Sequence, residues 1–437
     1  HLPKKDADLE SQLYSVNGFN GALSDRIPLN RSLPDIRHPG CKSRLYLEQL
    51  PTVSVVVPFH NEHWSTLLRT AYSVLYRSPP HLIKEIFLVD DASTKEFLGA
   101  ELESYVAQHM PKVRVVRLAQ RSGLIAARLA GARRASADVL LFLDSHTEAN
   151  VNWLPPLLEP IALEWRTVVC PYIDVVAYDT FEYRAQDSGA RGAFDWELFY
   201  KRLPLLPRDE QRMPESPVMA GGLFAISTAF FWQLGGYDPG LDIWGGEQYE
   251  LSFKVWQCGG RMVDAPCSRV GHIYRKFAPF PNPGHGDFVG KNYRRVAEVW
   301  MDEYAEHVYR RRPHYRDIDP GDLSQQRALR DKLRCKSFHW FMTQVPYQYN
   351  RNASESRRAV TIDGALHNVT KCMIRAPSDG VFLRYYKLFC MYIGSRLLVC
   401  QFVTEFECHE KFNKKFFFYL VVDLLSMNTM LRRSTTK

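Results

Sequence analysis

Asp144 and His146 are the residues whose types and spacing most clearly suit metal chemistry. They stand two residues apart, directly after the hydrophobic run 139–143, and an extended backbone would project both side chains from one face. A carboxylate beside an imidazole suits a divalent cation of the Mn²⁺ type, whereas Mg²⁺ prefers oxygen ligands alone. In isolation, Asp144 could instead cap the turn after its strand, and His146 could simply be solvated.

A second acidic segment favours the metal interpretation. Asp90 and Asp91 follow the run 86–89 in the same way, and Asp91 could hold a ribose hydroxyl or a base, as acidic groups do in nucleotide sites. A metal ion bridging a diphosphate would stabilise the charge that develops as a nucleotide leaves, and nucleotide-sugar donors present that leaving group. The cationic side chains that could assist are Arg121, Arg128 and Arg275.

The elements around these segments predict a parallel sheet that positions them. Runs rich in Val, Ile and Leu alternate with segments of helical spacing, which is typical of a doubly wound α/β fold with right-handed crossovers. Ligands of such sheets bind beyond the carboxyl ends of the strands, where both acidic segments lie. The predicted strands are 53–57, 85–89, 113–118 and 139–143, and the predicted helices are 63–76, 95–108 and 124–135.

The amino-acid composition limits the classes of protein to which this chain can belong. The 437 residues are 46% hydrophobic and 24% charged, which predicts a globular chain of two domains and excludes disordered and collagen-like proteins. Uncharged apolar runs are too short to predict a membrane-spanning helix. The net charge of +8 is concentrated in 346–437, which holds 14 of the 56 Lys and Arg but only 7 of the 48 Asp and Glu. A nucleic-acid enzyme would carry its basic surface on the working domain, so we expect no nucleic-acid partner.

Changes in pattern along the chain predict four parts. They are a polar, irregular lead-in (1–50), a catalytic domain (51–312), a linker (313–345) with a charged helix over 317–334, and a second domain (346–437). Because the chain begins with His1 rather than Met, we expect a processed product whose signal or anchor lay upstream.

Cysteines and glycosylation sequons indicate a secretory compartment. The nine cysteines form no C-x-x-C pair, which argues against structural zinc. The sequons begin at Asn30, Asn352 and Asn368. Together they favour a disulfide-permissive environment.

Six motifs in chain order resemble those of the UDP-GalNAc:polypeptide N-acetylgalactosaminyltransferases. The likeness runs with few interruptions from about residue 40 to residue 312, and more weakly to about residue 343. The motifs are Asp144-Ser145-His146, Phe194-Asp195-Trp196, Ala220-Gly221-Gly222-Leu223-Phe224, Trp244-Gly245-Gly246-Glu247, Cys267-Ser268-Arg269-Val270-Gly271-His272 and Ala297-Glu298-Val299-Trp300-Met301-Asp302.

The resemblance implies a Rossmann-like GT-A glycosyltransferase domain with Mn²⁺ as its cofactor. Its activity would be transfer of GalNAc from UDP-GalNAc to Ser or Thr of mucin-type polypeptides, with retention at the anomeric carbon. The protein would work in the Golgi lumen as a type II membrane protein, and the chain would touch the membrane only through an N-terminal anchor that it lacks.

The resemblance also implies site roles, residue by residue. Asp144, His146 and His272 would be the Mn²⁺ ligands, and Glu247, Asp144 and Arg275 would act in catalysis. The donor would be bound by His60, Glu62, Asp91, Arg121, Ser145, Gly222, Trp244, Gln248, Arg275 and Phe280. Phe194 and Trp196 would lie near the acceptor groove.

Each of these assignments has a structural alternative. Trp244 and Trp196 could be core aromatic residues, and Gly221-Gly222 could mark only a tight turn. His272 could be a satisfied structural histidine. Glu247 could be a surface carboxylate.

The resemblance implies two disulfides, Cys41–Cys267 and Cys258–Cys335. Cys170 lies in an apolar strand and is predicted to be a buried free thiol.

The chain departs from the usual family pattern at two site positions. Gln248 replaces the common Asn, as in a subgroup that prefers acceptors already carrying GalNAc, so we expect glycopeptide acceptors to be favoured. Phe280 replaces the usual Tyr and removes a hydroxyl donor, worth about 1 kcal/mol if the bond is made.

The largest departure is C-terminal. Relatives end in a ricin-type β-trefoil lectin, but here only 361–373 resembles the start of a first repeat, and 361–437 is too short for three. We expect a truncated or divergent lectin-like region, whose Phe416-Phe417-Phe418 and basic end could also form a membrane-surface or partner patch.

Two alternative functions stay open from the sequence. One is a catalytically inactive relative that binds UDP or glycopeptide as a partner protein. The other is a transferase that uses UDP-GlcNAc or UDP-glucose, since a few contacts decide between epimeric sugars.

Overall fold

The computed structural model describes residues 4–186, 189–205, 213–279, 282, 284–348, 400–403 and 419–421. The chain divides into two units, His1–Ser354 and Glu355–Lys437. In the second unit, the described residues form the antiparallel pair β12 (Cys400–Val403) and β13 (Tyr419–Val421). Phe280, the sequons at Asn352 and Asn368 and most of the predicted lectin-like region lie outside the described residues.

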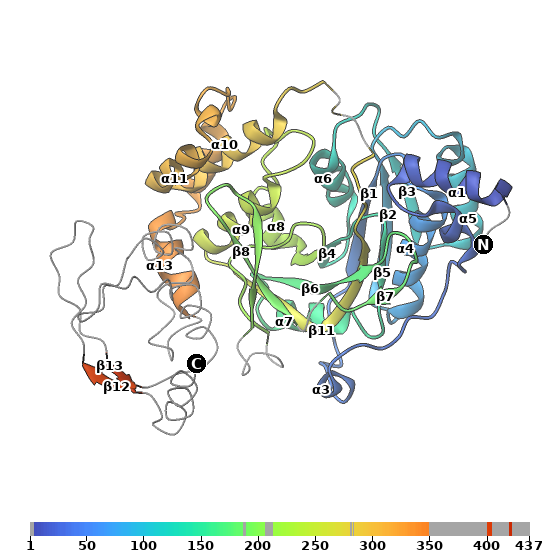
Figure 1. Ribbon diagram of the computed structural model, residues 1–437, viewed down its shortest axis with the longest axis horizontal. Helices are drawn as coiled ribbons and strands as arrows, with labels where there is room; N and C mark the ends of the chain where they lie inside the picture. Colours follow the sequence, from blue (N-terminus) through green and yellow to red (C-terminus); the bar gives the residue numbers. More distant parts are fainter. Residues whose placement is uncertain are drawn as a thin grey trace, which may run out of the picture. The chain divides into compact units, whose positions relative to one another are not determined.

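A mixed sheet forms the centre of the first unit (Figure 1). Its strands are β1 (Val53–Phe59), β2 (Ile83–Asp90), β3 (Val113–Arg117), β4 (Val139–Phe142), β5 (Thr147–Ala149), β6 (Thr167–Val176), β7 (Tyr183–Arg184), β10 (Phe224–Ser227) and β11 (Arg261–Ile273). In the described part their order is β3-β2-β1-β4-β10-β6-β11-β5, with β7 paired to β6. Strands β1 to β4 are parallel, and β10 is antiparallel to both neighbours. The predicted doubly wound topology is confirmed, because chain order reverses between β1 and β4, the place where such sheets bind ligands.

The crossover helices cover both faces of this sheet. They are α4 (Trp64–Arg77), α5 (Ala100–His109), which follows the 3₁₀ turn η1 (Glu96–Leu98), and α6 (Leu124–Arg134), close to the three predicted ranges. Val55 and Val57 of β1 lie in the core cluster with α4 residues such as Leu67. Val56 of β1 faces Gly131 of α6. A Cβ atom added at Gly131 would lie only 2.5 Å from Cγ1 of Val56, so glycine at this position is what lets the helix approach the strand.

The lead-in segment is helical, so the expectation of an irregular segment is wrong. It contains α1 (Lys4–Asn17), α2 (Gly21–Arg26) and α3 (Pro39–Lys42). The Asn20 side chain caps α2, accepting from the Leu23 N–H at 2.9 Å. The buried Arg69 of α4 donates to the carbonyls of Ser24 and Ile27, which holds the lead-in on the catalytic core.

The remaining described elements of the first unit follow β5 along the chain. They are α7 (Pro155–Leu163), the hairpin β8 (Ala190–Phe194) and β9 (Tyr200–Pro204), α8 (Thr228–Gln233), α9 (Glu247–Gln257), α10 (Phe288–Trp300), η3 (Asp302–Tyr304), α11 (Ala305–Arg311), η4 (Pro313–Arg316), α12 (Ser324–Lys332) and α13 (Phe338–Gln348). The helix predicted over 317–334 begins only at Ser324. Pro320 and Gly321, with its φ of +70°, prevent an earlier start.

Both predicted disulfides are present. Cys41–Cys267 joins the lead-in to β11, and Cys258–Cys335 joins the end of α9 to the segment after α12. Cys170 is a buried free thiol, as predicted. Within the described residues, no helix combines the length and the apolar character needed to span a bilayer.

Candidate active site

A cavity of about 570 Å³ lies beyond the carboxyl ends of β1, β2 and β4 and contains the predicted site residues. Every predicted catalytic, donor-binding and metal-binding residue within the described part lines it. They are His60, Glu62, Asp91, Arg121, Asp144, Ser145, His146, Gly222, Trp244, Glu247, Gln248, His272 and Arg275.

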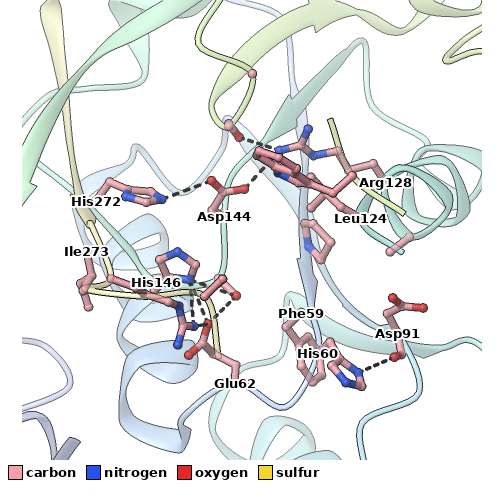
Figure 2. Close-up of a pocket in the computed structure, with 18 of the residues that line it drawn as sticks. Phe59, His60, Glu62, Asp91, Leu124, Arg128, Asp144, His146, His272 and Ile273 are labelled. Carbon is pink, nitrogen blue, oxygen red and sulfur yellow. Dashed lines mark hydrogen bonds and ion pairs between the residues drawn. The ribbon is translucent and has the colours of Figure 1, made fainter. Parts of the chain in front are cut away.

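Asp144 occupies the centre of this cavity, two residues beyond the end of β4. Figure 2 shows its carboxylate between two basic side chains. Oδ2 lies 3.3 Å from His272 Nε2, and Oδ1 accepts from Arg128 Nη2 at 3.1 Å. Burial opposes ionisation, but the bond from His272 and the charge of Arg128 outweigh it and lower the pKa of Asp144 to about 2. A Cβ on Gly222 would lie 2.5 Å from Oδ2, so only glycine leaves room for this carboxylate.

Glu62 fixes the orientation of His146. Its Oε2 atom lies 2.9 Å from His146 Nδ1 and accepts from Ser145 Oγ at 2.8 Å. Burial would raise the pKa of Glu62, but Arg275 and His146 hold it well below its ordinary value. An ionised carboxylate only accepts, so His146 must donate from Nδ1, which leaves Nε2 for a ligand. Burial, then the charge of Arg275, lowers the pKa of His146 and favours the neutral ring that a metal needs.

Of the three predicted metal ligands, Asp144 and His272 lie close together, and His146 lies beside His272. The His146 and His272 rings are 4.7 Å apart, and the 3.3 Å between His272 and Asp144 is close to the ~3 Å that separates neighbouring ligands bound at ~2.1 Å. In the part of the chain that the structure describes, no three or more His, Cys, Asp or Glu side chains are grouped so as to hold a metal ion by themselves. Binding of a metal by Asp144, His146 and His272 together therefore stays a prediction.

Glu62 and His60 lie in different parts of the cavity although only Asn61 separates them in sequence. Glu62 is turned to His146, whereas His60 is turned to Asp91 (Figure 2). His60 Nδ1 donates to the Asp91 carbonyl at 2.7 Å, and burial lowers the pKa of His60 to about 4, so its ring is neutral. The resemblance places Glu62 in the uridine pocket, a role that stays a prediction, and its side chain contacts Ser145, His146 and Arg275.

The Asp91 carboxylate holds the turn that begins α6. It accepts from the backbone N–H groups of Ser122 at 2.6 Å and Gly123 at 2.7 Å, and it pairs with Arg121. Gly123 has a φ of +91°, and a Cβ there would lie 2.3 Å from Ile243 Cα, beside the Trp244 segment. Asp91 therefore positions one wall of the cavity.

Arg128 links the two catalytic carboxylates proposed from the sequence. It is fully buried, and its Nη1 atom lies 3.7 Å from Oε1 of Glu247, the first residue of α9. Nη2 donates to the Gly222 carbonyl at 3.2 Å as well as to Asp144. Glu247 Oε2 is buried without a partner in the described structure, and burial raises the pKa of Glu247 although Arg128 opposes this. Glu247 is thus not a surface carboxylate.

The aromatic residues divide into two groups. Trp244 is 54% exposed at the cavity, so it is not a core residue. Phe194 and Trp196 are buried and do not line the cavity. Phe194 packs on Phe253 of α9, and Trp196 stacks on His307 at 4.5 Å between ring centroids.

Sequence reasoning missed the contribution of the lead-in segment to this site. Arg275 Nη1 donates to the Asn17 carbonyl, and its guanidinium lies 4.9 Å from the centroid of the Phe19 ring. These partners are separated from Arg275 by over 250 residues and carry no motif. Only their positions in the folded chain connect them to the cavity.

Comparisons with known proteins agree with this geometry. Residues 54–235 match the model of the glycosyl transferase family 2, and residues 211–277 match that of the N-terminal domain of galactosyltransferase. The chain is 60% identical over 367 residues to N-acetylgalactosaminyltransferase 6 of Drosophila melanogaster, covering 83% of this chain and 55% of that protein. It is 59% identical over 350 residues to polypeptide N-acetylgalactosaminyltransferase 10 of Homo sapiens, covering 79% of this chain and 58% of that protein. The chain thus spans less than two thirds of the length of these relatives.

A solved structure extends the likeness to three dimensions. The chain matches the crystal structure of GalNAc-T7 with UDP, GalNAc and Mn²⁺ at a TM-score of 0.77 and 43% identity, over 80% of this chain and 67% of that one. The first unit accordingly has the GT-A glycosyltransferase fold. The chain belongs to the polypeptide N-acetylgalactosaminyltransferase family.

Proposed function

We propose that this chain is a Mn²⁺-dependent glycosyltransferase that moves GalNAc from UDP-GalNAc to Ser or Thr of polypeptides, with retention at the anomeric carbon. The observation that carries the proposal is Asp144, ionised between His272 and Arg128 at the centre of the cavity. Membership of the family supports the donor and the acceptor class, and Mn²⁺ in the GalNAc-T7 structure supports the metal.

At the metal end, Asp144, His146 and His272 would hold Mn²⁺. The ion would neutralise charge on the UDP diphosphate as it leaves. Arg275 lies beside this set, with Nη2 2.6 Å from Glu62 Oε2, and supplies a second positive charge for the diphosphate. Ser145 Oγ would lie next to the same phosphates.

At the sugar end, Arg128, Gly222, Glu247 and Gln248 would surround the GalNAc, with the Glu247 carboxylate accepting from sugar hydroxyls. In the reaction, the bond between the anomeric carbon and the UDP oxygen breaks, and a new bond forms to the acceptor oxygen on the same face. The acceptor proton passes to the departing phosphate. No enzymic nucleophile is required.

The uridine would lie at the end of the cavity formed by His60, Asp91 and Arg121. Gln248 supports a preference for peptides that already carry GalNAc. The proposed site of action is the Golgi lumen, as the family resemblance implies.

Transfer to matched peptides tests this proposal. The chain is incubated with UDP-GalNAc, Mn²⁺ and either a naked Thr peptide or the same peptide bearing GalNAc, and products are weighed by mass spectrometry. We expect the addition of one HexNAc, with faster transfer to the glycopeptide. Binding of UDP without transfer to either peptide would contradict the proposal and would favour the inactive, ligand-binding relative.

A further inference from the structure

The lead-in segment 17–19 contacts the residues directly after β11, on the edge of the cavity. Arg275 donates from Nη1 to the Asn17 carbonyl and lies over the Phe19 ring. The Lys276 N–H donates to the Gly18 carbonyl at 2.9 Å. Two backbone carbonyls and one aromatic face of the lead-in therefore hold Arg275 of the cavity and the residue that follows it.

Glycine at position 18 is what allows this close approach. Gly18 ends α1, with its N–H 2.8 Å from the Tyr14 carbonyl and a φ of +73°, where other residues are strained. A Cβ at this position would lie 2.6 Å from the Phe277 carbonyl oxygen and 3.3 Å from Arg275 Cβ. The first contact is with backbone, so a side chain would force the two segments apart.

The segment 17–19 is itself firmly anchored. Phe19 is fully buried in a cluster with Phe181 and with Ile273, the last residue of β11. The Asn20 N–H donates to the Tyr178 carbonyl at 2.7 Å. The lead-in can therefore act as a fixed reference for the residues after β11.

The Nη2 side of the Arg275 guanidinium lies beside Glu62 and His146, near the proposed metal ligands. Its Nη2 atom lies 2.6 Å from Glu62 Oε2 and 3.5 Å from His146 Nδ1, and the side chain is only 10% exposed. A shift of the backbone at Gly18 would move the guanidinium relative to Glu62 and His146.

We propose that the lead-in segment 17–19 positions Arg275 for the donor diphosphate and that Gly18 is the positioning residue. This inference rests on the proposed function, which gives Arg275 its ligand. The lead-in then supports the donor site from outside, because residues 17–19 do not line the cavity.

The test measures UDP affinity by calorimetry in the presence of Mn²⁺. Gly18→Ala is compared with Gly321→Ala, a matched control with a φ of +70° and its nearest neighbour, Arg295 Nη1, at an ordinary 3.4 Å. We expect Gly18→Ala to weaken UDP binding about tenfold, which is less than the ~100-fold that a misplacement of about 1 Å can cost at positioned groups. Gly321→Ala should bind UDP as the unchanged chain does. The donor KM should rise in Gly18→Ala, whereas the acceptor KM should not.

A double-mutant cycle separates positioning from general damage. In an Arg275→Ala background, Gly18→Ala should cause no further loss of UDP affinity. An equal tenfold loss in that background, or no loss from Gly18→Ala alone, would overturn the inference. An unchanged chain that binds no UDP would instead overturn the proposed function, and this inference with it.

A second variant covers the case in which Gly18→Ala does not fold. Tyr14 is half-buried on α1, and its ring lies 6.1 Å from that of Phe277. Tyr14→Ala removes a contact between the lead-in and the residues after β11 and leaves the buried Phe19 in place. We therefore expect it to weaken UDP binding about threefold. Unaltered UDP affinity in Tyr14→Ala would contradict the inference.

Discussion

His146 and Glu62 form a hydrogen-bonded pair, 2.9 Å from Nδ1 to Oε2, at the edge of the cavity. Glu62 is 1% exposed and is held at the start of α4, where it also accepts from the His63 N–H at 2.9 Å. A carboxylate behind a ligating histidine is the usual way to fix the tautomer and raise the basicity of the metal-binding nitrogen. In this site the carboxylate comes from the segment after β1 and the histidine from the segment after β4.

The first prediction concerns this pair. Glu62→Gln keeps the size of the side chain but removes the charge that orients His146 and pairs with Arg275. We expect Mn²⁺ affinity, measured in the presence of UDP by the electron paramagnetic resonance of free Mn²⁺, to fall roughly 10- to 100-fold. Glu85→Gln is the control, because Glu85 bonds to Ser54 and Ser136 away from the cavity. Equal Mn²⁺ affinity in both variants would contradict the assigned role.

The second prediction concerns Arg128, the buried cation between two carboxylates. Arg128→Met leaves Asp144 and Glu247 without their shared partner, which should cost about 3–5 kcal/mol in the free energy of unfolding. The initial rate of GalNAc transfer should fall at least ~100-fold, because the loss of one hydrogen-bond donor that stabilises charge in the transition state has this effect in other active sites. Arg133→Met is the control, since Arg133 is exposed on the same helix. Urea unfolding and initial rates measure both effects, and a variant as stable and active as the control would refute this role.

A third prediction concerns the pH dependence of stability. Burial raises the pKa of Asp264 from its ordinary 3.8 to about 7, while Ser216 and two arginines oppose the shift. The folded chain therefore binds a proton that the unfolded chain releases near pH 4, so this carboxyl makes the folded state less stable as pH rises from about 4 to about 7.

Asp264→Asn should remove that contribution. The stability of the variant relative to the unchanged chain should grow with pH across this window by up to about 4 kcal/mol, at 1.36 kcal/mol for each pKa unit. Denaturant unfolding at pH 4, 5.5 and 7 measures the difference, in which the contributions of other groups cancel. A difference that is the same at all three pH values would show that Asp264 ionises normally.

Local patterns in the sequence were sufficient to predict the four parallel strands β1 to β4 and the polar residues that follow them. β1, β2 and β4 are short apolar runs bounded by polar residues, so their carboxyl ends could be located to within two residues. Asp144 and His146 lie just beyond the end of β4, and this position, together with Asp90 and Asp91 at another strand end, made them candidates from the sequence. The family motifs added residues from distant segments, such as His272 and Glu247, that periodicity could not have grouped.

Long-range contacts could not be predicted in the same way. The turn of Glu62 towards His146 depends on the φ of +48° at Asn61, which no pattern signals. The lead-in looked irregular because α1 is polar, with most of its described side chains exposed or only partly buried, and it is held in place through segment 17–19 and α2. The late start of α12 follows from Pro320-Gly321, which the charge pattern over 317–334 concealed.

We propose above all that Asp144 helps to hold the metal ion of a GalNAc transferase. The most direct measurement is HexNAc transfer to a Thr glycopeptide over a series of Mn²⁺ concentrations, for the unchanged chain, Asp144→Asn and Asp138→Asn. Asp138 is an exposed carboxylate just before β4 and provides the matched control. We predict Mn²⁺-dependent transfer that survives in Asp138→Asn and falls by at least ~1,000-fold in Asp144→Asn. Transfer that persists in Asp144→Asn, or that needs no divalent ion, would contradict this account.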